Sequence, residues 1–105
     1  MARLPSSFRQ RNRTARSFRE QYARLPKTIQ ELTRDACRKF YADPDHLSFR
    51  RHELKDRKGA SHQSGSVSIS ITMQHRAIFV EIAGINVWYW IGTHAEYKHF
   101  TASKS

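Results

Sequence analysis

The segment Ile85-Asn-Val-Trp-Tyr-Trp-Ile91, followed directly by Gly92-Thr-His-Ala-Glu-Tyr97, constrains the fold more than any other part of the chain. Seven residues with almost no polar interruption predict a strand that is covered on both faces. The next six residues place His94, Glu96 and Tyr97 just past the end of that strand. Because a rigid sheet holds such side chains at fixed positions, the sequence predicts a functional site there.

The length and charge of the chain limit its organisation and its partners. Its 105 residues suffice for one domain with one hydrophobic core. Lys and Arg number 19 against 9 Asp and Glu, which gives a formal net charge of +10 at pH 7. Charge of this density attracts polyanions, and nucleic acid is the leading expectation because phosphate backbones release counterions on binding. An acidic protein partner would use the same field, and composition does not separate the two.

Cysteine, histidine and apolar content narrow the class of protein further. Cys37 is the only cysteine, so no intrachain disulfide can form, and its position indicates a small buried apolar residue of a helix. The six histidines include no pair four apart on a predicted helix, so we expect no metal site and no cofactor. No apolar run approaches the ~20 residues of a membrane span, and the N-terminus lacks the apolar centre of a signal peptide. We therefore expect a cytoplasmic protein without membrane contact.

The N-terminal half is expected to contain a basic arm and two helices. Residues 1–13 have the composition of a flexible arm, which either contacts RNA or only aids solubility, and residues 14–105 are expected to form a single domain. A Ser-x-x-Glu capping box at Ser17–Glu20 predicts a short helix that ends at Leu25-Pro26. Pro26 opens a second helix, which Asp43-Pro44 ends. The buried stripe predicted for this helix consists of Ile29, Leu32, Ala36, Cys37 and Phe40.

Four strands are expected in the second half of the chain. They are 47–54, which is weak, 66–73, which alternates most clearly, 76–82 and 85–91. Residues 55–64 read as an exposed cationic loop. The short links imply an antiparallel meander with the helices on one face and the other face open. The predicted fold is therefore α+β, with an N-terminal helical hairpin packed on one face of a four-stranded, mainly antiparallel sheet.

Arg76 begins one predicted strand and His94 follows the next, so antiparallel pairing would bring both to one edge of the sheet. An arginine holds a phosphate through paired hydrogen bonds, and a histidine exchanges a proton near neutral pH. Together they suit cleavage of RNA by its own 2′-hydroxyl, a path that requires no metal. The local features also fit a surface ion pair for Arg76 and a satisfied loop residue for His94.

Other signals of nucleotide chemistry are weak or lacking in the sequence. Trp88 and Trp90 are expected to share one face of their strand, where they could stack on unpaired bases, but their apolar neighbours favour a place in the core. No glycine-rich phosphate loop, nucleophile elbow or helix-turn-helix signature is present. Ordinary nucleotide enzymes are therefore not expected.

Four stretches of the chain resemble motifs of one known family. They are Phe18-Arg-Glu-Gln-Tyr-Ala-Arg-Leu-Pro26, Tyr41-Ala-Asp-Pro44, Gln74-His-Arg-Ala-Ile78 and Trp88-Tyr-Trp-Ile-Gly-Thr-His-Ala-Glu-Tyr97. From about Ser17 to Phe100 the chain resembles the RelE/ParE superfamily of toxins from bacterial type II toxin–antitoxin systems, in particular its RelE-like and YafQ-like mRNA interferase branch. The resemblance implies a small α+β fold, cleavage of mRNA in the ribosomal A site, and neutralisation by a cognate antitoxin.

The resemblance also implies roles for individual residues. Arg76 matches the arginine that holds the phosphate, His94 falls where YafQ-like toxins have a catalytic histidine, and Tyr97 matches the aromatic position shortly after it. Glu96 takes the acidic position of the motif, where it either orients His94 or is solvated. The residues expected to contact RNA are Arg50, Arg51, Lys55, Arg57, Lys58 and Ser70.

The chain departs from RelE-like members on the strand before Arg76, where Ser68 and Ser70 stand in place of a usual lysine or arginine. The missing charge could come from the adjoining strand and loop, which carry Arg50, Arg51 and Lys55. Two other functions stay open at this point. One is a non-enzymatic ParE-like toxin that inhibits DNA gyrase, and the other is a catalytically inactive basic module that binds RNA or the ribosome.

Overall fold

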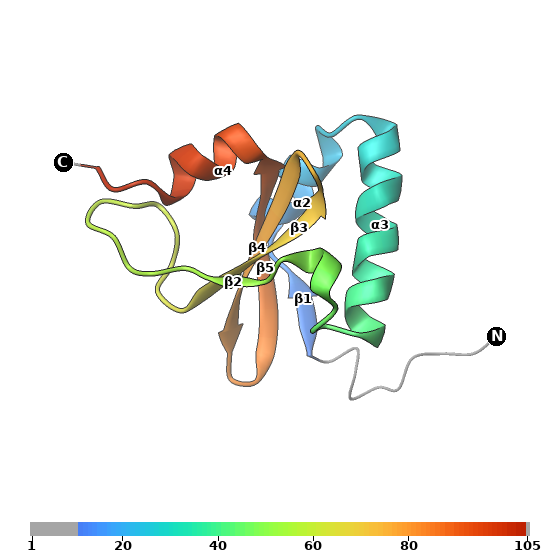
Figure 1. Cartoon of the computed structure of the whole chain (residues 1–105), viewed down its shortest axis with the longest axis horizontal. Helices are drawn as coiled ribbons and strands as arrows, with labels where there is room; N and C mark the ends of the chain where they lie inside the picture. Colours follow the sequence, from blue (N-terminus) through green and yellow to red (C-terminus); the bar gives the residue numbers. More distant parts are fainter. Residues whose placement is uncertain (1–10, 105) are drawn as a thin grey trace.

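The structure is a computed structural model and describes residues 11–104. This part of the chain contains three α-helices, one 3-10 helix and five strands (Figure 1). In chain order they are β1 (Asn12–Thr14), α2 (Arg16–Ala23), α3 (Lys27–Ala42), the 3-10 helix η1 (Leu47–Phe49), β2 (His52–Glu53), β3 (Ser66–Thr72), β4 (His75–Ile82), β5 (Ile85–Thr93) and α4 (His94–Thr101). Within residues 11–104, no helix has the length and apolar character needed to cross a membrane.

The five strands form one sheet in the order β1-β5-β4-β3-β2. As predicted, β3, β4 and β5 pair antiparallel through short turns, and β2 pairs antiparallel with β3. β1 joins the other edge and runs parallel to β5. The prediction of an α+β fold with a mainly antiparallel sheet is confirmed, whereas the prediction of four strands is wrong because β1 adds a fifth.

β1 lies at the end of the segment that composition assigned to a basic arm. Asn12 pairs with Asn86 of β5, and its side-chain oxygen accepts a hydrogen bond from the Trp88 indole N–H at 3.1 Å. A strand of three residues carries no periodic apolar signal, so only its pairing with β5 defines it. Residues 1–10 of the predicted arm lie outside the described residues, and the division into arm and domain stays a prediction.

The predicted strand 47–54 is mostly wrong. Its first half forms η1, and only His52 and Glu53 pair with β3. Arg50 separates the two elements with a φ of 45°, in the left-handed region that side chains with a Cβ rarely adopt. That backbone conformation is incompatible with a strand, so pairing can begin only after Arg50.

The capping box predicted at Ser17–Glu20 is also wrong. Ala15 is the N-cap of α2, and the Ser17 hydroxyl donates to the carbonyl oxygen of Tyr89 at 2.6 Å. Gln21 accepts a hydrogen bond from the backbone N–H of Ile91 at 2.9 Å. Polar side chains of α2 therefore satisfy the edge of β5 beyond the point where β1 ends, in place of a longer strand.

The first hydrophobic core lies between the sheet and helices α2 and α3, with Phe40 of α3 in its midst. The Phe40 ring contacts Phe49, Phe79 and Trp88 edge to face, with ring centroids 5.4, 5.7 and 5.1 Å away. The stripe predicted for α3 is partly right, since Phe40 is buried but Leu32 is 47 % exposed. Burial raises the pKa of the Cys37 thiol, which suits the structural role predicted for it.

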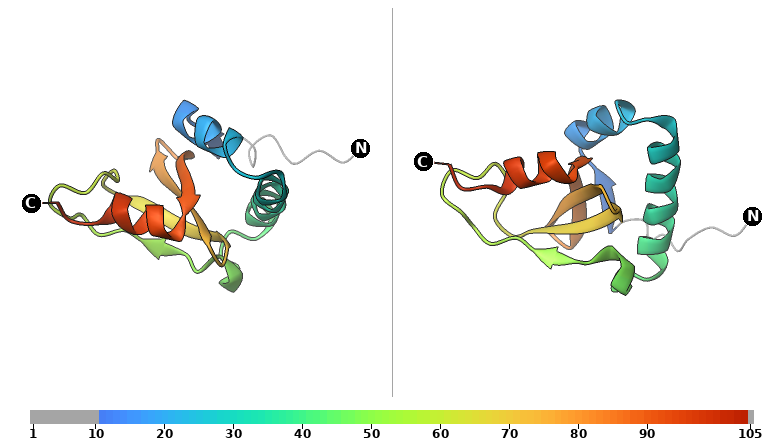
Figure 2. Two further views of the ribbon diagram at one scale, coloured as in Figure 1. Left: turned by 90° about the horizontal axis from the view of Figure 1, so that it is seen from above. Right: turned by 45° about the horizontal axis from the view of Figure 1, so that its top comes forward.

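The opposite face of the sheet, which the sequence predicted to be open, is covered by α4 (Figure 2). Tyr97 and Phe100 of this helix pack against a second core of Ile78, Val80, Tyr89 and Trp90. The sheet is therefore buried on both faces, and its functional groups can reach solvent only near its edges and ends.

A β-bulge in β5 separates the two tryptophans. Ile78 pairs with Trp90 and Phe79 with Trp88, so Tyr89 lies between them without a partner on β4. The extra residue reverses the alternation, and Trp88 belongs to the first core while Trp90 belongs to the second. The prediction that they share a face is wrong. Both are buried, which leaves neither free to stack on a base.

Candidate functional site

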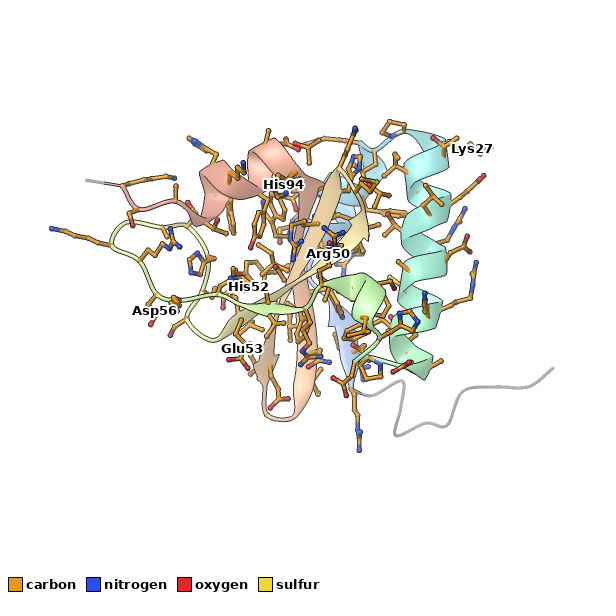
Figure 3. The ribbon with its side chains drawn as sticks, in the orientation of Figure 1. Lys27, Arg50, His52, Glu53, Asp56 and His94 are labelled. Carbon is orange, nitrogen blue, oxygen red and sulfur yellow. The ribbon has the colours of Figure 1, made fainter. Side chains whose placement is uncertain are left out.

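A groove of about 350 Å³ lies where the β3–β4 turn, η1 and the start of α4 meet. We call it the arginine groove, and it is lined by Ser48, Arg50, Ser70, Ile71, Thr72, Met73, Arg76 and His94. The register of the sheet explains its composition, because Arg76 pairs with Ser70 on one side and Gly92 on the other. His94 begins α4 two residues after Gly92, and Figure 3 shows it together with Arg50 on the same side of the molecule.

The Arg76 guanidinium is held by a backbone carbonyl oxygen and by two serines of β3. Its NH1 group donates to Ser70 Oγ at 2.9 Å, and its NH2 group donates to Ser68 Oγ at 2.7 Å and to the Arg50 carbonyl oxygen at 3.1 Å. Its Nε–H donates to Ser68 Oγ at 3.3 Å. The Tyr97 ring lies 5.0 Å from the guanidinium carbon, within range of a cation–π contact. These hydrogen bonds and the Tyr97 ring together hold the Arg76 guanidinium in place.

The arginine groove holds positive charge without a neutralising carboxylate. Burial lowers the pKa of Arg76, the contacts with Tyr97 act against this, and the nearby charge of Arg50 lowers the pKa again. Among residues 11–104, the ion pairs join Arg16 with Glu20 and Arg38 with Asp35, neither of them in the groove. Two guanidinium groups beside one cavity, with no ion pair to either among the described residues, have the chemistry to hold an anion.

His94 is exposed at the mouth of the groove. Its ring stacks on that of Tyr97, with centroids 5.9 Å apart, and its backbone N–H donates to the Gln74 carbonyl oxygen at 2.7 Å. The ring nitrogens form no hydrogen bond with any residue in the described range, so both are available to hydrogen-bond to a bound molecule. Tyr97 itself does not line the groove, and its hydroxyl lies 3.2 Å from Ser68 Oγ.

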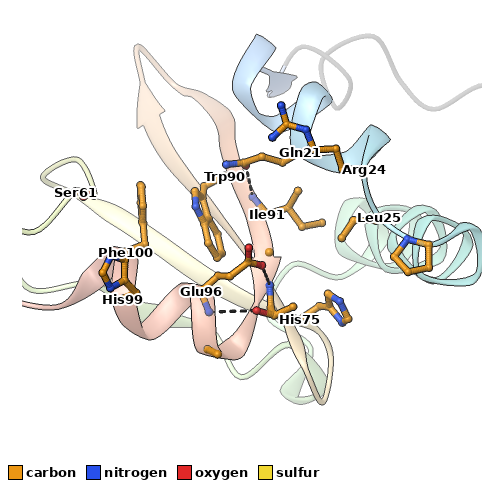
Figure 4. A pocket seen from close by; sticks show the side chains of 14 residues that line it. Gln21, Arg24, Leu25, Ser61, His75, Trp90, Ile91, Glu96, His99 and Phe100 are labelled. Atoms are coloured by element: carbon orange, nitrogen blue, oxygen red, sulfur yellow. Dashed lines mark hydrogen bonds between the residues drawn. The ribbon is translucent and has the colours of Figure 1, made fainter.

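Glu96 is exposed to solvent, which is one of the two alternatives that the sequence left open, and it also caps a helix. Its Oε1 accepts from the Thr93 backbone N–H at 2.8 Å, and Thr93 Oγ1 accepts from the Glu96 N–H at 3.2 Å (Figure 4). These reciprocal bonds form a capping box at the start of α4. Glu96 therefore fixes the helix that carries His94 and Tyr97, and no contact joins its carboxylate to the His94 ring.

The bonds from Thr93, and more weakly the nearby His75, hold the pKa of Glu96 below its usual range. Because the pKa is lowered by folding, the ionised carboxylate stabilises the protein above about pH 4.3, and this contribution is lost as the pH falls through the lowered pKa. We expect the free energy of unfolding to fall less steeply in this acid range for Glu96→Gln than for the wild type. Denaturant titrations between pH 3 and 7 measure this pH dependence of the free energy of unfolding. The control is Glu53→Gln, which removes an exposed carboxyl group of β2.

The residues predicted to contact RNA lie at three different places on the molecule. Arg50 and Ser70 line the arginine groove. Arg51 lies on the opposite face of the sheet, the face of the first core, where its guanidinium carbon is 5.4 Å from the centroid of the Phe79 ring. The other three are exposed on the long loop between β2 and β3, which hydrogen-bonds to the C-terminal segment away from the groove; they are Lys55, Arg57 and Lys58.

A larger groove of about 820 Å³ lies between α2 and α4, over the edge of β5 (Figure 4). Leu25, Trp90 and Phe100 give it apolar walls, and it contains neither Arg76 nor His94. No group of three or more His, Cys, Asp or Glu side chains within residues 11–104 could hold a metal ion. The larger groove also contains one guanidinium, that of Arg24, together with His75 and His99. Of the grooves described, only the arginine groove combines two guanidinium groups with an imidazole.

These features define a small basic α+β protein with a groove lined by two arginines and a histidine at the end of its central hairpin. The chain has the fold of RelE/ParE-type toxins. It is similar to YafQ from E. coli strain BL21(DE3), with a TM-score of 0.63 and 11 % identity over 82 % of this chain and 94 % of that one. A YoeB/ParE toxin from Agrobacterium tumefaciens gives a TM-score of 0.60 and 19 % identity over 80 % and 98 % of the two chains.

A copper-bound mutant toxin from Helicobacter pylori is similar over 83 % of this chain and 97 % of that one, with a TM-score of 0.56 and 14 % identity. No protein-family model and no curated protein matches the sequence. At these identities the likeness establishes the fold, and the roles of individual residues rest on the geometry of the groove.

Proposed function

We propose that the protein is the toxin of a toxin–antitoxin pair and acts as a ribosome-dependent mRNA endonuclease. The observation that supports this most is the arginine groove, which combines two uncompensated guanidinium groups with a free imidazole. A phosphodiester carries the charge that the arginines bind, and its cleavage needs the proton that a histidine can give. The cognate antitoxin, the mRNA and the ribosome are the partners that this function requires.

In the proposed reaction, the 2′-oxygen attacks the adjacent phosphorus and the bond from phosphorus to the 5′-oxygen breaks. His94, as general acid, gives its proton to the departing 5′-oxygen, and the proton of the 2′-hydroxyl passes to solvent or to a neutral base. The products are a 2′,3′-cyclic phosphate and a 5′-hydroxyl. Arg76 stabilises the charge that builds on the phosphoryl oxygens. Tyr97 positions both His94 and Arg76 through its ring contacts.

The hydrogen bonds of Arg76 suggest that a second cation is needed. A guanidinium has five N–H donors, and four of those in Arg76 go to Ser68, Ser70 and the Arg50 carbonyl oxygen. At most one N–H, on NH1, remains, so Arg76 offers a fixed charge and no more than a single hydrogen bond, not the paired bonds expected from the sequence. The Arg50 side chain is exposed beside it and is proposed to bind the same phosphate.

Arg50 and Arg51 form a matched pair that tests this assignment. Arg50→Ala is expected to weaken binding of single-stranded RNA by roughly tenfold and to reduce the slope of log K against log salt by about one, because one phosphate contact is lost. Arg51→Ala removes the same charge from the opposite face and should change the affinity by less than about twofold. Fluorescence anisotropy over a salt series measures both, and equal losses for the two variants would refute the role of Arg50.

The remaining cationic residues predicted to bind RNA are proposed to act outside the groove. Lys55, Arg57 and Lys58 are exposed on one loop and are proposed to contact the phosphate backbone of the mRNA or of ribosomal RNA. Ser70 is proposed to act near the substrate phosphate and to hold Arg76.

The proposed function is tested by adding the purified protein to translating ribosomes and mapping new mRNA 5′ ends by primer extension. We expect ends confined to A-site positions and dependent on ribosomes. Absence of new ends, with protein shown by circular dichroism to be folded, would reject the nuclease. A gyrase supercoiling assay and a ribosome-binding assay on the same protein would then decide between the other two functions.

A further inference from the structure

We infer that Ser68 is a positioning residue of the site, a single buried hydroxyl that fixes Arg76 and Tyr97 together. The consequence for cleavage rests on the proposed function, whereas the positioning itself does not. Ser68 lies in the middle of β3 and is 0 % exposed, so it cannot touch the substrate. Whatever it contributes must pass through the groups that it contacts.

The contacts of the Ser68 hydroxyl use all of its hydrogen-bonding capacity. Its oxygen accepts from Arg76 Nε at 3.3 Å and from Arg76 NH2 at 2.7 Å, which fills the two acceptor positions of a hydroxyl. The remaining group is its own proton, and the Tyr97 hydroxyl oxygen lies 3.2 Å away. Ser68 therefore donates to Tyr97, and Arg76 sets the direction of that bond.

The direction of the hydrogen bond from Ser68 to Tyr97 helps to fix the positions of both Tyr97 and Arg76. Tyr97 accepts from Ser68, so its ring stays over the guanidinium at 5.0 Å and beside the His94 ring at 5.9 Å. Arg76 is meanwhile turned so that any unused N–H lies on NH1, the end that bonds to Ser70 in the groove. The serine that replaces a basic residue therefore supports a catalytic arrangement made of other residues.

Ser66 provides a matched control on the same strand. It is 1 % exposed, and its hydroxyl bonds to Tyr89 and to the Gln63 carbonyl oxygen at 2.6 Å each. Neither of these hydrogen bonds involves Arg76 or Tyr97. Ser66→Ala thus removes an equally buried hydroxyl from the same face of the sheet and reports the purely structural cost.

The first arm of the test measures the position of Arg76 without any substrate. The Nε–H resonance of Arg76 is assigned in ¹⁵N spectra by its loss in Arg76→Lys. We expect Ser68→Ala to increase the rate of hydrogen exchange at this Nε–H by roughly tenfold or more, because the hydrogen bond that protects it is gone. Ser66→Ala should leave that rate unchanged.

The second arm measures cleavage on programmed ribosomes. We expect Ser68→Ala to lower kcat by roughly 10- to 100-fold with little change in KM, because misplaced groups slow the chemical step more than binding. In an Arg76→Lys background, which cannot make the paired bonds, Ser68→Ala should have little further effect. Should the alanine variant not fold, Ser68→Cys keeps the size and supplies a poor acceptor, with the same two outcomes expected.

Equal exchange rates at Arg76 Nε–H in Ser66→Ala and Ser68→Ala would overturn the positioning role. If the exchange rates of Ser68→Ala and Ser66→Ala differ as expected but the wild type cuts no mRNA, the proposed function is rejected and the positioning role of Ser68 stands. A Ser68→Ala effect on kcat that persists in full in the Arg76→Lys background would also overturn the inference, since Ser68 would then act without Arg76.

Discussion

Replacement of His94 by alanine is expected to lower the rate of mRNA cleavage by roughly 10²- to 10⁴-fold, the usual contribution of a general acid. The ring is exposed at the mouth of the arginine groove, and its nitrogens bond to no other residue among those described. Its loss therefore removes a proton donor and leaves no buried group unpaired. The backbone N–H of residue 94 can still bond to Gln74, so α4 should keep its start.

The control for this variant is His99→Ala. His99 is also an exposed histidine of α4, but it faces the larger groove between α2 and α4. Single-turnover cleavage, thermal unfolding and RNA affinity are compared for the three proteins. We expect His94→Ala to unfold and to bind RNA like the wild type while failing to cut, and His99→Ala to behave as the wild type in all three assays. An unchanged cleavage rate in His94→Ala would remove it from the mechanism.

Arg76→Ala is expected to affect both activity and stability. Loss of a preorganised donor to a developing charge lowers the cleavage rate by roughly 10²- to 10³-fold. The change also leaves the buried Ser68 oxygen without its two donors, which costs about 1–3 kcal/mol in the free energy of unfolding. Arg76→Lys keeps a positive charge but not the fork of N–H groups, so we expect intermediate values of both quantities.

Urea titrations and single-turnover cleavage measure these two effects, with Arg38→Ala as the control. Arg38 is an exposed arginine of α3 that pairs with Asp35 away from the groove, so its loss changes the net charge equally. We expect its cleavage rate to stay within about threefold of the wild type, since exposed charges contribute little at a distance. A cleavage rate for Arg76→Ala as high as that of Arg38→Ala would contradict the proposed clamp.

Local sequence patterns were enough to predict the hairpins formed by β3, β4 and β5. They also predicted that Arg76 and His94 lie at the same edge of the sheet. Alternation in β3 and the apolar run of β5 set these strands to within two residues, and Asp43-Pro44 marks the end of α3. Short turns leave antiparallel pairing as the simple way to connect β4 and β5. The approach of Arg76 and His94 to one edge follows from that pairing, which is why the sequence could predict it.

The sequence contains the capping pattern that starts α4, but its residues also fit a functional cluster, and from the sequence alone we interpret them only in that way. Thr93-His-Ala-Glu96 matches the Thr-x-x-Glu capping pattern, whereas the Ser17–Glu20 match forms no capping box. The pattern is short, and its use depends on whether the side chains have better partners. Ser17 finds one in the Tyr89 carbonyl oxygen, a group 72 residues away in the chain.

The sequence by itself determined the order of the main strands, the basic character and the pairing that brings Arg76 to His94. Only the tertiary structure decided which neighbouring side chains serve the site. Arg50 and Arg51 are adjacent, yet a left-handed backbone at Arg50 sends them to different surfaces, and one extra residue in β5 does the same for the two tryptophans. Such choices depend on single backbone dihedrals and on distant hydrogen-bond partners, which no local pattern of residues encodes.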